Sequence, residues 1–77
     1  MNKIFILASP LCIKVLVFSK NEMLEEVNVR KSKLAETLNN FISKYNITEI
    51  QVKGAESYIK NIIPSLNNSN VKISYRF

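Results

Sequence analysis

The 77-residue chain contains no histidine, no aspartate and no tryptophan, and it has one glycine and one cysteine. Without histidine, the most common general base in enzymes is missing, and so are the Ser-His and Cys-His pairs that activate nucleophiles. A single glycine, Gly54, excludes the glycine-rich loops that cradle phosphates. A single cysteine, Cys12, excludes an internal disulfide and a zinc site built from cysteine pairs. The composition therefore predicts a protein that is not an enzyme and that holds no metal and no cofactor.

The chain is basic, with eleven Lys and Arg residues against six acidic residues, all of them Glu, and a formal net charge of +5. A basic excess is found in proteins that bind nucleic acids or acidic proteins, and also on ordinary solvated surfaces. The candidate nucleic-acid-binding residues are Arg30, Lys31, Lys33, Lys53, Lys72 and Arg76. Phosphate contacts by these side chains would make binding strongly dependent on salt.

Two apolar runs at the start of the chain are separated by Ser9-Pro10. Lys3 followed by an apolar run is similar to a signal peptide, but Lys14 interrupts the second run. As a helix, residues 4–18 would span about 22 Å, which is less than the hydrocarbon core of about 30 Å. We therefore predict two strands around a turn, with Cys12 as a small core residue. The expected location is the cytoplasm, without membrane contact.

The spacing of apolar residues predicts seven elements in a single domain, residues 1–77. We expect strands over 4–8, 12–18, 23–30, 48–53 and 71–77, and helices over 32–45 and 55–66. Ser32 is the expected N-cap of the first helix, and Asn46 its left-handed exit. Pro64 should kink or stop the second helix.

The order of these elements is β-β-β-α-β-α-β. Strand–helix–strand units imply parallel pairing with right-handed crossovers. The sequence therefore predicts an α/β fold with a five-stranded mixed sheet in the order 3-2-1-4-5. Both crossovers run in the same direction, so both helices should lie on one face of the sheet.

Two segments of this pattern resemble known domains. ILASPLCIKVLVF is similar to the first two strands of RuvC-type and YqgF-type domains in the ribonuclease H-like superfamily, and LNNFISKYNITEIQVKG is similar to their first helix and fourth strand. Relatives use several carboxylates to hold two divalent metals. Here Ser9 or Ala8 stands where the first carboxylate would map, and Glu56 is the only acid near a matching position. The resemblance implies a ribonuclease H-like domain that is catalytically inactive.

The first two strands are apolar on both faces, yet helices cover only one face. The uncovered side chains are either Phe5, Leu7, Leu16 and Phe18 or Ile4, Ile6, Val15 and Val17, and we take the first set as the candidate protein interface. This predicts a small protein-interaction module that docks on a protein partner or forms a homo-oligomer.

The biological setting is indicated only by composition. The abundance of Asn, Ile and Lys is typical of AT-rich genomes, so we expect a phage-encoded assembly component or inhibitor, in the host cytoplasm or in a virion. The alternative is a basic nucleic-acid-binding module without nuclease activity. Tyr45, Tyr58 and Tyr75 fall on apolar stripes, which favours core packing over base stacking.

Overall fold

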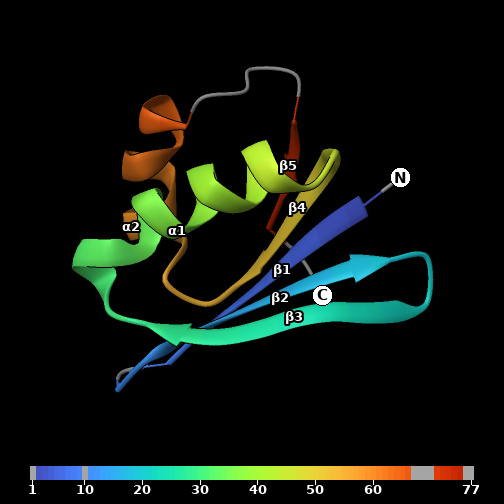
Figure 1. Ribbon diagram of the computed structural model, residues 1–77. Coiled ribbons are helices and arrows are strands. Elements are labelled where there is room, and N and C mark those ends of the chain that lie inside the picture. The colour runs from blue at the N-terminus through green and yellow to red at the C-terminus, as the bar shows by residue number, and fades with distance from the viewer. Residues whose placement is uncertain (1, 10, 67–70, 76–77) are drawn as a thin grey trace.

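The computed structural model describes residues 2–9, 11–66 and 71–75, and in it five strands form one mixed sheet with two α-helices on one face (Figure 1). The elements are β1 (Asn2–Ala8), β2 (Ile13–Ser19), β3 (Glu22–Val29), α1 (Lys31–Lys44), β4 (Ile47–Lys53), α2 (Glu56–Ile62), a 3₁₀ turn η1 (Ile63–Ser65) and β5 (Lys72–Ser74). The strand order is β3-β2-β1-β4-β5, which confirms the predicted order of elements and strands.

The directions of the strands follow from their connections. β1, β2 and β3 form an antiparallel meander, while β4 pairs in parallel with β1, and β5 in parallel with β4. A two-residue turn joins β2 to β3, and Lys20 takes a positive φ of 58° there. The β1–β2 turn is closed by Ser9, whose N–H and hydroxyl both donate to the Cys12 carbonyl, at 2.9 Å and 2.8 Å.

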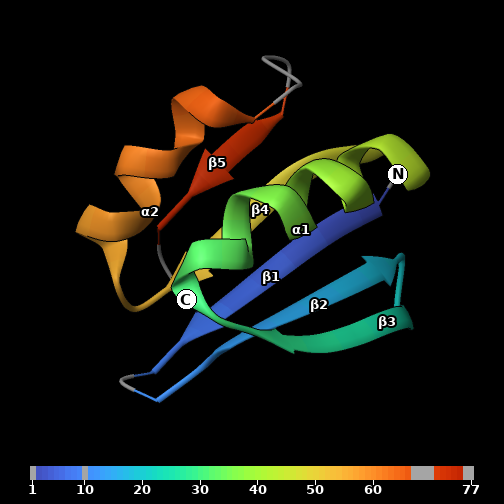
Figure 2. The same ribbon diagram turned by 60° about the vertical axis from the view of Figure 1, so that its left-hand side comes forward.

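The core lies between the sheet and the helix layer, which Figure 2 shows from its helical side. Its buried members from the sheet are Ile4, Ile6, Ile13, Val15, Val17, Ile47, Ile50 and Val52, and those from the helices are Leu34, Leu38, Phe41, Ile42 and Ile59. Because side chains alternate between the two faces of a strand, the apolar residues between these positions on β1 and β2 point away from the helices. This places the predicted set Phe5, Leu7, Leu16 and Phe18 on the open face.

The ends of the first helix differ from the prediction. Arg30, not Ser32, is the N-cap of α1, and no side chain caps the helix there. Ser32 lies inside the first turn because the chain is already helical at Lys31. At the other end, Tyr45 leaves the helix with extended backbone angles, so no left-handed exit at Asn46 is needed.

The second helix ends as its proline predicts. α2 stops at Ile62, and the chain continues as the 3₁₀ turn that contains Pro64. Of the predicted last strand, the residues 72–74 form β5. Pro10, Arg76, Phe77 and residues 67–70 lie outside the described residues.

Cys12 is exposed, so the prediction of a core cysteine was wrong. The reason is that β2 begins one residue later, at Ile13, which takes the buried position. Cys12 belongs to the β1–β2 turn, where its Sγ lies 3.9 Å from the Ser9 hydroxyl.

Candidate protein interface

The open face of the sheet presents three rows of side chains that run across the strands. We name each row after its residue on β1 and give its members in sheet order from β3. The Lys3 row consists of Met23, Phe18, Lys3, Glu49 and Lys72, and the Phe5 row consists of Glu26, Leu16, Phe5, Gln51 and Ser74. The Leu7 row consists of Asn28, Lys14, Leu7 and Lys53. Residues directly opposite on neighbouring strands lie close enough to interact. These rows define which side chains of the face are neighbours.

The apolar residues of the face form one contiguous group, which we call the open-face cluster. It consists of Phe5, Leu7, Leu16, Phe18 and Met23. Leu16 is directly opposite Phe5 in the register, and the rings of Phe5 and Phe18 pack edge to face with centroids 5.3 Å apart. The first four side chains are half-buried and Met23 is 49% exposed. The structure thus brings all four residues of the predicted interface together.

Met23 was not among the residues predicted for the interface. An irregularity in the β2–β3 pairing, between Val17 and Phe18, places Met23 opposite Phe18 and so extends the cluster onto the third strand. A bulge of this kind inserts one residue and reverses the alternation beyond it. The alternating pattern of β3 alone cannot reveal it, because bulges leave no clear mark in a short strand.

Ion pairs flank the cluster on both sides. Lys3 Nζ lies 3.5 Å from Glu49 Oε1, and Lys14 Nζ lies 3.1 Å from Glu26 Oε2. A hydrogen bond from Gln51 Nε2 to Glu49, at 3.1 Å, together with the nearby lysines, lowers the pKa of the Glu49 carboxyl. Exposed pairs of this kind stabilise the fold by less than about 1 kcal/mol. Their effect is to give the face an apolar centre with a charged margin.

The candidate nucleic-acid-binding residues do not form one patch. Lys53 and Lys72 lie on the open face, Lys53 directly beside Leu7 of the cluster and Lys72 farther away, on β5. Arg30, Lys31 and Lys33 lie at the start of α1, on the helical side of the molecule, and Arg76 is outside the described residues. Two cations of the open face, Lys3 and Lys14, were missed because each stands alone in an apolar run.

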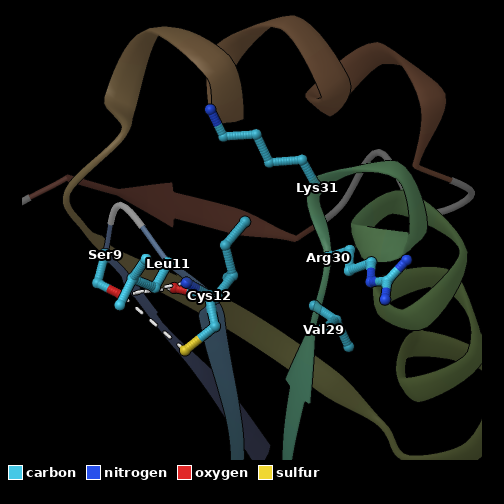
Figure 3. A pocket seen from close by; sticks show the side chains of 7 residues that line it. Ser9, Leu11, Cys12, Val29, Arg30 and Lys31 are labelled. Carbon is cyan, nitrogen blue, oxygen red and sulfur yellow. Dashed lines mark hydrogen bonds between the residues drawn. The ribbon is translucent and has the colours of Figure 1, made fainter.

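A hollow lies between the β1–β2 turn and the start of α1 (Figure 3). Ser9, Leu11 and Cys12 line one side of it, and Arg30 and Lys31 the other. Figure 3 shows Arg30 pointing away from Ser9 and Cys12, whereas Lys31 extends over the hollow, and Lys31 Nζ lies 5.4 Å from the centre of the Tyr58 ring. Its polar groups therefore do not converge on a common point, as those of a ligand site do.

On the helical side, Glu25 ties β3 to the end of α1. Lys44 Nζ lies 3.0 Å from Glu25 Oε2, and the Tyr45 hydroxyl donates a hydrogen bond to the same oxygen. Both bonds lower the pKa of Glu25, and the bond from Tyr45 to Glu25 raises the pKa of the Tyr45 phenol because it favours the protonated form. The group holds the two elements together.

In the described ranges, no three Cys or Glu side chains gather closely enough to hold a metal ion. No helix in this part of the chain has the length and apolar character needed to cross a membrane. Comparison with known proteins finds no match: no family model, no curated protein and no solved structure is similar to the chain.

Proposed function

We propose that the protein is a non-enzymatic interaction module that self-associates through the open face of its sheet. The observation that supports this most strongly is the open-face cluster, which lies on the side of the sheet that neither helix covers. Contiguous apolar surface with a polar margin is typical of protein–protein contacts. Burying it against a second copy would remove this apolar area from water.

The size of the face agrees with this function. The molecule has extents of 29 × 23 × 22 Å and exposes 5083 Å². One side of such a nearly isometric body carries roughly a sixth of that surface, about 800 Å², which is the area that each partner contributes to a standard interface.

A second copy suits the charges of the face. The margin carries both signs, with Glu26 and Glu49 set among four lysines. A face of mixed sign can meet its own copy without opposing only like charges. A chain of this length also has a small core, and burial in a dimer stabilises the folded state.

The absence of histidine and aspartate supports a non-enzymatic role. We further propose that the chain is a catalytically inactive ribonuclease H-like domain, because Ala8 and Ser9 stand where the resemblance requires a metal-binding carboxylate. Self-association through one flat face suits a component of a larger assembly. The AT-rich character of the composition favours a phage particle or a phage-encoded inhibitor as the setting.

Single-stranded nucleic acid is the second candidate ligand for the same face. Two aromatic rings, Phe5 and Phe18, lie on neighbouring strands among Lys3, Lys14, Lys53 and Lys72. Open sheets with aromatic rings and cations bind single strands by base stacking and phosphate contacts. However, the two planes meet at 88°, so the rings pack on each other instead of presenting two parallel platforms.

Light scattering of matched variants tests self-association. We expect the unmodified chain to be a dimer at high micromolar concentration and Leu16→Lys to be a monomer, because the new charge would be buried at the centre of the interface. Asn40→Lys adds the same charge on the exposed outer side of α1 and should remain a dimer. A monomeric unmodified chain, or a dimer that Leu16→Lys leaves intact, would refute the proposal.

Fluorescence anisotropy with a labelled single-stranded oligonucleotide tests the second candidate. If the face binds nucleic acid, affinity should fall steeply between roughly 50 and 200 mM salt. Leu16→Lys would then bind at least as tightly as the unmodified chain, whereas it should lose self-association. Absence of binding at roughly 50 mM salt excludes this candidate.

A further inference from the structure

Resting on the proposed self-association, we infer that two copies pack face to face around a two-fold axis that runs parallel to the strands, between β1 and β2. The symmetry of a two-fold contact restricts which side chains can meet. A residue on the axis faces its own copy, and any other contact occurs twice. The rows of the open face therefore allow the candidate axes to be compared.

Four of the five residues of the open-face cluster lie on β1 and β2, and the fifth, Met23, lies on β3. β1 contributes Phe5 and Leu7, and β2 contributes Leu16 and Phe18. A two-fold axis between these strands exchanges them, so Phe5 of one copy faces Leu16 of the other, twice. An axis closer to β4 would place Glu49, Gln51 and Lys53 over the apolar residues of β1, and an axis along β2 would set Lys14 against Lys14.

The charges agree with the same axis. It places Lys3 over Phe18, Leu7 over the stem of Lys14, and Gln51 over Glu26, so no like charges face one another. An alternative axis along β1 would set Lys3 of one copy against Lys3 of the other. A second alternative, perpendicular to the strands and along the Phe5 row, would set Glu26 against Glu26. Opposed like charges in an interface are costly, so the axis between β1 and β2 is preferred.

The resulting dimer has four layers, with the two sheets inside and the helices outside. Packed sheets lie about 10 Å apart, with strand directions within about 30° of each other. At the margin, Asn28 on β3 of one copy faces Lys53 on β4 of the other. The two Asn28 residues are separated sideways by three strand spacings, about 14 Å. Pairs of unlike positions are thus much closer than pairs of like positions.

Cross-linking of single-cysteine variants tests this geometry. Asn28→Cys and Lys53→Cys are both made in a Cys12→Ser background, because Cys12 is exposed. Positions 28 and 53 are also exposed and lie outside the open-face cluster. One variant carries a tag that changes its mass, and a short bis-maleimide is added to each variant alone and to their mixture. Asn40→Cys, on the outer side of α1, is the control.

We expect the mixture to give mainly the species that joins position 28 of one chain to position 53 of the other, with little product from either variant alone and none with Asn40→Cys. A Met23→Cys variant tests the alternative axis along the Phe5 row, which would bring position 23 of one chain over position 28 of the other. If the chain is a dimer and this link is preferred, the inferred axis is wrong, although self-association stands. Equal linking of like and unlike positions also refutes the axis. A monomeric chain refutes both the axis and the proposed function.

Discussion

Phe5 and Phe18 meet edge to face on the open side of the sheet, with ring centroids 5.3 Å apart and ring planes at 88°. They lie on neighbouring strands, β1 and β2, and in adjacent rows of the face. Each ring restrains the other before any partner binds. A preformed apolar surface loses little conformational entropy on association, so this pair prepares the face for docking.

Replacing Phe18 by leucine should remove the ring–ring interaction while keeping the position apolar. We expect the free energy of unfolding to fall by about 0.5–1.5 kcal/mol, the usual contribution of an aromatic pair. Urea denaturation at a fixed protein concentration measures it. Met23→Leu changes an exposed member of the same cluster and should alter stability by less than about 0.5 kcal/mol. Equal effects of the two variants would argue against a specific ring pair.

The melting temperature should rise with protein concentration. Because association stabilises the folded state by mass action, a self-associating chain unfolds at higher temperature when it is concentrated. Thermal melts followed by circular dichroism over a wide concentration range measure this. Leu16→Lys should melt at one temperature throughout. A concentration-independent melt of the unmodified chain would contradict self-association in the folded state.

The bonds of Glu25 predict how stability depends on acid. The pKa of Glu25 is lowered from 4.5 in the folded protein by hydrogen bonds from Tyr45 and Lys44. The unfolded chain therefore binds the proton more readily, and the stabilisation is present above pH 4.5 and lost as the pH falls through the lowered folded-state pKa. In Glu25→Gln, stability should fall less steeply below pH 4.5 than in the unmodified chain.

Urea denaturation at several pH values compares the two proteins. A tyrosinate titration gives an independent check, because the raised pKa of Tyr45 should return toward 10.0 in Glu25→Gln. Identical acid profiles and an unchanged phenol titration would show that the Glu25 contacts do not form in solution.

Gly54 should not tolerate a side chain. Its φ is +84°, and a Cβ there would lie 2.6 Å from the carbonyl oxygen of Ala8. Both the positive φ and the backbone contact oppose alanine, so Gly54→Ala should destabilise the fold by about 1–3 kcal/mol. Ala55, with a φ of 51°, has a left-handed backbone that glycine adopts without strain, so Ala55→Gly should leave stability unchanged or raise it by about 1 kcal/mol. Denaturation of the two variants measures the contrast.

The strand order could be predicted from the sequence. The change from alternating to helical spacing of apolar residues gives the order of the elements, and the right-handedness of crossovers then limits how the strands are arranged. The same patterns could not predict that Cys12 lies in a turn, since a shift of one residue at the start of β2 decides its exposure. Nor could they place Met23 in the cluster, because the bulge in β3 depends on pairing with β2. Contacts between distant segments, such as Glu25 with Tyr45, also need the assembled fold.

For the open face, sequence alternation left two candidate sets of side chains and could not separate them. The helices decide between them, because Ile4, Ile6, Val15 and Val17 are buried on their side. What the pattern could not show is the ion pairs that surround the remaining set, since Lys3 and Glu49 are brought together only by the parallel pairing of β1 with β4.

Sedimentation equilibrium of the unmodified chain at several micromolar concentrations tests self-association most directly. We predict a mass that approaches twice the chain mass of 8.9 kDa as concentration rises, and that Leu16→Lys stays at the single-chain mass under the same conditions. A single-chain mass for the unmodified protein at every concentration would contradict the account.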